Sequence, residues 1–173
     1  PHKVVEAVLN DEADLGILSY PAPSRSLAVL PLRSEAMAFV CHPAHRLARR
    51  KVVTAADLNG ENFIAFDSNL AIRKAIDRCL KQHNAKVNVV MEFDNIETIK
   101  QAIAIAAGVS ILPMRTVLKE VGIHTLQAVP LDMTELVRPV GIIHRRQKRF
   151  TPAVARFIDL LRHSDGKAGG SPP

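Results

Sequence analysis

The sequence predicts an α/β fold of two lobes, with a mostly parallel sheet and a pair of strands that link the lobes. Strand-like apolar runs alternate with helical patterns, which is typical of βαβ units. The middle segment, about 45–140, holds a complete set of these units, whereas the outer segments hold partial sets that must combine with one another. The predicted limits are 1–43 for a partial first lobe, 44–140 for the second lobe, 141–163 for the return to the first lobe, and 164–173 for a disordered tail.

The outer segments are predicted to form short elements. Val4, Val8 and Leu9 recur at helical spacing, which predicts an amphipathic helix over 3–10. Pro152 stands at the first position of the last predicted helix, where its fixed φ is favourable. The other elements of the outer segments are strands at 14–18, 27–32, 36–41 and 137–144 and the last helix at 153–162.

The middle segment shows helix-start signals. Thr54 and Asp57 form a capping-box-like start to a single helical turn. Asp67, Ser68 and Asn69 are predicted to cap a helix that ends near His83, and Asn95 is predicted to cap a second helix that ends at Gly108. The remaining predicted elements are strands at 63–66, 87–93, 109–112 and 123–129 and a short helix at 116–121.

The chain is basic, which raises the question of nucleic-acid binding. It has 173 residues, a net charge of +6 and 4% aromatic residues without Trp, so a stacking platform for single strands is lacking. Its basic residues cluster after strand-like runs and not along a periodic helix, so we interpret them as solvated loop charge. The two clusters are Arg46, Arg49, Arg50 and Lys51, and Arg145, Arg146, Lys148 and Arg149.

The cysteines and the start of the chain indicate a cytoplasmic protein. Cys41 and Cys79 are far apart, without a C-x-x-C motif or a paired His spacing, and are interpreted as thiols of a reducing compartment. His42 and His144 lie near Cys41 on the linking strands, but their spacing is no metal signature. The chain has no apolar run of 18 residues and no signal-peptide pattern at its start. We therefore predict no disulfide, metal site, cofactor or membrane partner.

Four segments in order resemble the effector domain of LysR-type transcriptional regulators. The segment Asp14-Leu15-Gly16-Ile17-Leu18 is similar to the family's first-lobe strand, and Pro43-Ala44-His45-Arg46-Leu47-Ala48 to its P-x-H-x-L-A segment. Residues 53–60, followed by Phe63-Ile64, resemble the step into the second lobe, and residues 106–113 resemble a strand that ends in Pro113. Because all four keep their order and spacing, the resemblance covers about residues 3–162.

This resemblance implies a periplasmic-binding-protein-like fold of type 2 with a small-molecule effector held between the lobes. An anion is one option for the effector. The family's domains form homodimers or tetramers, and the resemblance places the dimer surface on 69–83 and 87–93. DNA contact is expected only through an N-terminal helix-turn-helix that is absent here. The first strands of the first lobe are also expected to be missing.

Three expected effector-binding residues follow strand 63–66. Ser68 and Asn69 lie where this strand leads into a helix, whose N-terminal N–H groups and positive dipole end favour an anion. Arg73 lies within the same helix, from where it can reach back over that end. The alternative is that the turn only caps the helix and that Arg73 is solvent-exposed.

Three more expected effector-binding residues lie elsewhere in the chain. The resemblance places Val109 and Ser110 at the family's other cleft position. The alternative for Ser110 is a core hydroxyl bonded to the backbone. Tyr20 follows strand 14–18 and either closes one side of the pocket or packs against Pro21.

Two other functions were weighed. An enzyme is disfavoured because the sequence has no G-x-S-x-G elbow, G-x-G-x-x-G turn or P-loop, and no catalytic residue is assigned. The alternative function is that of a periplasmic solute-binding protein of a transport system, which shares the two-lobe architecture. It is disfavoured by the missing signal peptide and by the family-like segments.

Overall fold

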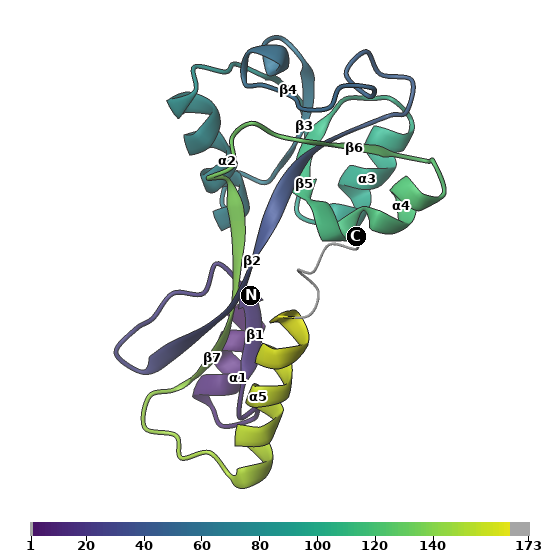
Figure 1. The fold of residues 1–173 in the computed structure, drawn as a ribbon. Helices are drawn as coiled ribbons and strands as arrows, with labels where there is room; N and C mark the ends of the chain where they lie inside the picture. The colour runs from purple at the N-terminus through teal and green to yellow at the C-terminus, as the bar shows by residue number, and fades with distance from the viewer. Residues whose placement is uncertain (1, 167–173) are drawn as a thin grey trace. The chain divides into compact units, whose positions relative to one another are not determined.

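A computed structural model describes residues 2–166, which divide into two compact units (Figure 1). Unit 2 is Glu35–Arg138, and unit 1 combines the residues before and after it. Both boundaries fall inside long strands, β2 (Leu27–Cys41) and β7 (Val137–Arg145), so these strands carry the chain from one unit to the other. The lobe limits given above stay a prediction. No helix in the described part of the chain has the length and apolar character needed to span a membrane.

Unit 1 packs helix α1 (His2–Leu9) against strand β1 (Gly16–Ser19). Strand β1 pairs antiparallel with β7, with Gly16 opposite Ile143. Gly16 allows the close approach of the helix, because a Cβ at this position would lie 2.6 Å from the Val4 side chain. Val8, Leu27 and Ile143 form the buried centre of this unit. The predicted first helix is therefore confirmed, and β1 provides the strand on which it packs.

Unit 1 ends in helix α5 (Pro152–Gly166), which is longer than the predicted helix at 153–162. The first residues of the predicted tail, Ser164 to Gly166, belong to this helix. The remainder of that predicted tail, 167–173, lies outside the described residues.

Unit 2 contains both antiparallel and parallel strand pairs. Strand β2 pairs antiparallel with β5 (Ser110–Pro113) and with β6 (Gln127–Pro130), whereas β3 (Asn62–Phe66) pairs parallel with β4 (Asn88–Phe93). The prediction of a mostly parallel sheet was wrong. Alternation of strands and helices predicts which segments are strands, but their direction depends on pairings between distant segments.

The two predicted strands at 27–32 and 36–41 are one continuous strand, β2. The polar residues between them resemble a break, yet Glu35 is 5% exposed and accepts hydrogen bonds from the Arg138 guanidinium on β7. A buried carboxylate needs such a partner. The strand continues because this long-range pair satisfies its polar residue.

Helices cover the β3–β4 pair. α2 (Ala71–Gln82) contacts β3, and α3 (Ile96–Ala104) contacts β3, β4 and β5. Ile99 and Ile103 of α3 are fully buried. The remaining elements of unit 2 are α4 (Leu118–Gly122) and two 3-10 turns, Ala56–Leu58 and Met114–Thr116.

Four helices end with a non-glycine residue in the left-handed region. At each end, the left-handed residue and its successor donate their N–H groups to carbonyls of the last helical turn, which is the Schellman pattern. The left-handed residues are Asp11 (φ 59°), Asn84 (φ 56°), Ala106 (φ 59°) and His124 (φ 60°).

These ends correct two predictions. α3 stops at Ala104 and not at Gly108. Gly108 instead lies against β3, since a Cβ there would be 2.7 Å from the carbonyl oxygen of Asn62. The strand expected at 123–129 begins only at Gln127, because His124 still belongs to the end of α4.

Candidate functional site

The candidate site lies where β3 ends and α2 begins. Ser68 and Asn69 form an exposed turn between them. The expected capping role of Asp67, Ser68 and Asn69 was wrong, because the N-cap residue is Leu70, whose side chain makes no capping hydrogen bond. The N–H groups at this helix end are therefore open to another partner, next to two exposed polar side chains.

Arg73 is anchored one turn into α2 and is not solvent-exposed. Its side chain is 13% exposed. Its Nη1 donates to the carbonyl oxygen of Phe66 at 2.6 Å, and its Nε donates to Asp77 at 2.9 Å. A third partner, the Glu92 carboxylate, lies 3.5 Å from Nη1. The guanidinium thus reaches back to the end of β3, as expected, where two carboxylates partly neutralise it.

Val109 and Ser110 lie directly beside β3. Val109 forms a parallel bridge with Phe63, and its carbonyl accepts a hydrogen bond from the Ile64 N–H at 2.8 Å. Ser110 is fully buried, and its hydroxyl donates to the Ile64 carbonyl at 2.7 Å. This bond is the alternative stated for Ser110, a core hydroxyl bonded to the backbone.

Five of the six expected residues belong to unit 2. Ser68, Asn69 and Arg73 lie where β3 leads into α2, whereas Val109 and Ser110 lie beside Phe63 and Ile64 within β3. Tyr20 belongs to unit 1, where its N–H donates to the Pro139 carbonyl at 2.8 Å and its φ is 53°.

The start of α3 differs from that of α2. The Asn95 side chain accepts hydrogen bonds from the N–H and the hydroxyl of Thr98, both at 2.9 Å. This is the ordinary cap that the sequence predicts. The hydrogen-bonding groups in the first turn of α3 are thus partly satisfied by the protein itself.

Half of the residues in the basic clusters form ion pairs within the chain. Arg46 contacts Glu61, and Arg50 lies 3.0 Å from Asp57. Arg145 contacts Asp11, and Lys148 reaches the same carboxylate at 2.8 Å. These partners support the interpretation of surface charge over a nucleic-acid interface.

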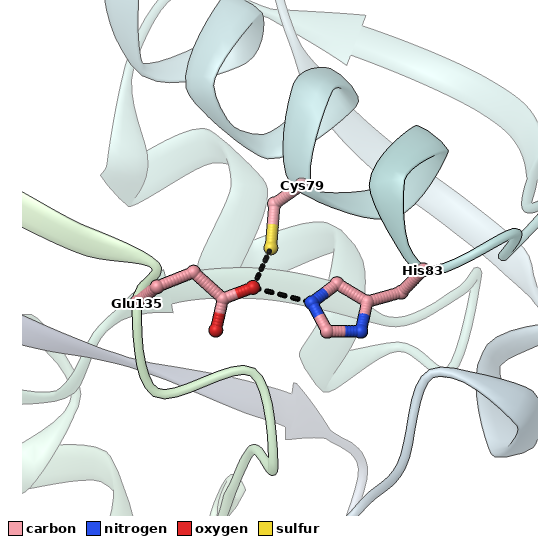
Figure 2. A group of neighbouring side chains, drawn as sticks. All are labelled: Cys79, His83 and Glu135. Atoms are coloured by element: carbon pink, nitrogen blue, oxygen red, sulfur yellow. Dashed lines mark hydrogen bonds and ion pairs between the residues drawn. The ribbon is translucent and has the colours of Figure 1, made fainter.

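A group of potential ligand atoms that sequence reasoning missed lies at the other end of α2. Cys79, His83 and Glu135 point toward one another (Figure 2). The Cys79 thiol donates to Glu135 Oε1 at 3.5 Å, and the same oxygen contacts His83 Nε2. The C-x-x-x-H spacing, one helical turn, was the available signal.

Both thiols are protonated at neutral pH. Burial and the nearby Glu61 carboxylate raise the pKa of Cys41 to about 12. Burial and the Glu135 carboxylate raise the pKa of Cys79 to about 11. Both residues are free cysteines in the structure, and the expected absence of a disulfide stays a prediction.

In the described part of the chain, Cys41, His42 and His144 on the linking strands do not bring metal-binding atoms together. Cys41 is fully buried, and His42 Nδ1 accepts a hydrogen bond from the Ala44 N–H. His144 packs edge-on against Phe150, with ring centroids 4.8 Å apart. Over residues 2–166, the group that could hold a metal ion is Cys79, His83 and Glu135.

The two α/β units and their pairings have the architecture of an effector-binding domain with the periplasmic-binding-protein-like type 2 fold. The CcmR regulatory domain of Synechocystis PCC6803, solved in complex with 2-PG, matches with a TM-score of 0.80 and 26% identity over 94% of this chain and 78% of that chain. Residues 1–165 match the LysR substrate binding domain. The chain belongs to this family.

Curated relatives agree with the family. The HTH-type transcriptional regulator YeiE of Escherichia coli (strain K12) is 30% identical over 156 residues, which are 90% of this chain and 53% of YeiE. A protein of Phaeodactylum tricornutum named "Probable RuBisCO transcriptional regulator" is 26% identical over 165 residues, 92% of this chain and 54% of its own length. The chain thus spans about half the length of these relatives, which are transcriptional regulators and not enzymes. The predicted family and fold are confirmed.

Proposed function

We propose that this chain is the sensing domain of a LysR-type transcriptional regulator and binds a small anionic metabolite at the end of β3. In the whole protein, the effector favours one of two conformations and thereby alters transcription through a DNA-binding helix-turn-helix. The family assignment and the regulator relatives support this function over that of a periplasmic solute-binding protein.

The uncapped start of α2 is the observation that carries this proposal. Its N-cap residue, Leu70, makes no side-chain hydrogen bond to the first turn, and Ser68 and Asn69 stand exposed beside it. A helix N-terminus with open N–H groups attracts carboxylates and phosphates through its donors and its dipole. Ser68 and Asn69 add donors to this site, and Arg73 holds the end of β3 in place by donating to the Phe66 carbonyl.

The other expected residues keep supporting roles in the proposal. Val109 and Ser110 align β5 beside β3, and their bonds to Ile64 fix the strand that leads into the Ser68 turn. Tyr20 stays a prediction from sequence, as does the location of the effector between two lobes.

A thermal-shift titration tests the site. We expect 2-PG, inorganic phosphate or a small carboxylate to raise the melting temperature of the chain by mass action. Ser68→Ala should reduce this shift, whereas Ser26→Ala, which changes an exposed serine of unit 1, should leave it unchanged. A ligand that keeps its full shift in Ser68→Ala would show that the site lies elsewhere.

We further propose a homodimer formed through α2 and β4. Strand β4 exposes three consecutive apolar residues, Val89, Val90 and Met91, each about 40% exposed. In the described part of the chain, β4 pairs only with β3, and such an apolar edge favours association. Light scattering should give twice the chain mass, and Val90→Lys should give the monomer. Ile123→Lys, at an exposed apolar residue outside α2 and β4, should leave the dimer intact.

Two further parts of the proposal concern location and DNA. We place the protein in the cytoplasm, because both cysteines are free thiols, as in a reducing compartment.

DNA recognition is assigned to a separate helix-turn-helix. A gel-shift assay with these 173 residues should therefore show no sequence-dependent retardation of DNA.

A further inference from the structure

The end of α2 and the segment before β7 bring three different metal-binding groups together. Cys79 lies in the last turns of α2, and His83 is its C-cap residue. Glu135 comes from a segment 52 residues further along than His83. Their potential ligand atoms all lie within 4.8 Å of one another (Figure 2).

Local structure fixes the two helical donors on one side of α2. Residues four apart on a helix share a face, so the side chains of Cys79 and His83 point the same way. The helix ends at this point because Asn84 adopts a left-handed φ of 56°, and the N–H of Ala85 donates to the Leu80 carbonyl at 2.9 Å. His83 is thereby placed at the helix end with its ring toward Glu135.

We propose that Cys79, His83 and Glu135 form a binding site for a single divalent transition-metal ion of the zinc class. One thiolate, one imidazole and one carboxylate are a donor set for Zn²⁺ or Co²⁺, whereas Mg²⁺ and Ca²⁺ take oxygen ligands. Three protein ligands leave the fourth position of a tetrahedral ion to water. The ion would join the end of α2 to the segment that leads into β7.

The distances suit one shared ion after a small movement. Two ligands on a tetrahedral Zn²⁺ lie about 3.5 Å apart for sulfur and oxygen and about 3.3 Å apart for nitrogen and oxygen. The Cys79 Sγ–Glu135 Oε1 distance is 3.5 Å. His83 Nε2 now bonds directly to Glu135 Oε1 and must separate from it. Both side chains can move, since His83 is 37% and Glu135 53% exposed.

The electrostatic environment favours a cation at this point. The Glu135 carboxylate lies between the other two groups, since its Oε1 accepts a hydrogen bond from the Cys79 thiol and contacts His83 Nε2. Metal binding replaces the thiol proton, which passes to solvent as the sulfur–metal bond forms.

A cobalt titration of the reduced full chain tests this site. We expect Co²⁺ to give a sulfur-to-metal charge-transfer band in the near ultraviolet together with visible bands of a four-coordinate ion, saturating at about one equivalent. Zn²⁺ should abolish both by competition and should raise the melting temperature. Absence of the charge-transfer band in an excess of Co²⁺ would overturn the proposal.

Matched variants assign the ligands. Cys79→Ser should remove the charge-transfer band, and Cys41→Ser should keep it, because Cys41 is a fully buried thiol outside the cluster. A band that persists in Cys79→Ser would overturn the site.

A second pair of variants changes exposed carboxylates, so its result does not depend on substituting a buried residue. Glu135 is about half exposed, so Glu135→Gln should fold normally and weaken Co²⁺ binding by at least about 10-fold. Glu6→Gln, at an exposed carboxylate of α1, should change the affinity by less than about 2-fold. Equal affinity in Glu135→Gln and the unmodified chain would exclude Glu135 as a ligand and refute the three-residue site. These readouts are independent of effector binding at Ser68.

Discussion

Helices α2 and α3 follow the two strands of the same parallel pair, yet their ends are built in opposite ways. α2 begins without a side-chain cap and ends with Asn84 in the left-handed region. α3 begins with the Asn95 cap and ends with Ala106 in the left-handed region. Asparagine tolerates this conformation, whereas alanine is strained there by about 1 to 2 kcal/mol. Each helix thus has one favourable end and one unfavourable end.

The two helix starts differ in whether their N–H groups are used by the protein itself or are available to a ligand. The start of α3 satisfies its own N–H groups, so little is left for a ligand. The start of α2 lacks such a cap, which leaves its N–H groups available beside Ser68 and Asn69. An uncapped helix end next to exposed polar residues is therefore the better candidate for an effector site.

The largest effect is expected from removing the α3 cap. Asn95→Ala loses the hydrogen bonds from the Thr98 N–H and hydroxyl, which should lower the free energy of unfolding by about 1 kcal/mol. Urea denaturation measures this change. Asn69→Ala, at the uncapped start of α2, should cost less than about 0.5 kcal/mol. An equal cost for the two variants would mean that Asn69 also serves as a cap.

A somewhat smaller gain is expected at the end of α3. Ala106→Gly relieves the left-handed strain but makes the unfolded chain more flexible, so the net gain should be about 0.5 to 1 kcal/mol. The exposed position of Ala106 means that little packing is lost. Thermal and urea unfolding measure the gain. Asn84→Gly should gain less, and a larger gain there would contradict the contrast between the two helix ends.

Sequence patterns predicted most segments because they depend on near neighbours. The Thr54–Asp57 capping box forms as expected, with the Thr54 N–H donating to Asp57 at 2.9 Å. The Asn95 cap forms for the same reason. Helix ends were harder to predict, since Ala106 and His124 occupy positions that glycine usually takes. Nothing in the local sequence marks an alanine that will adopt a positive φ.

The candidate site was predicted in part. The position of Ser68 and Asn69 after a strand could be read from the sequence, and both are exposed as a ligand contact requires. The partner of Ser110 is Ile64, 46 residues away, and the partner of Cys79 is Glu135, 56 residues away. Such contacts arise from strand order and loop packing, which periodicity does not encode.

The smallest expected effect comes from adding the missing cap to α2. Leu70 has φ −78° and ψ 141°, the extended geometry of an N-cap residue, so Leu70→Asn should place a side-chain oxygen on the open N–H groups. We expect a gain of about 0.5 kcal/mol in the free energy of unfolding, because the new cap is partly offset by the loss of a half-buried leucine.

The same variant decides what the open end of α2 does. If its N–H groups bind the effector, the new cap competes for them, and the anion-induced thermal shift should fall although the unliganded chain is more stable. Leu70→Met, which adds no acceptor, should leave the shift unchanged. A shift of full size in Leu70→Asn, together with the expected gain in stability, would show that the first turn of α2 makes no contact with the anion.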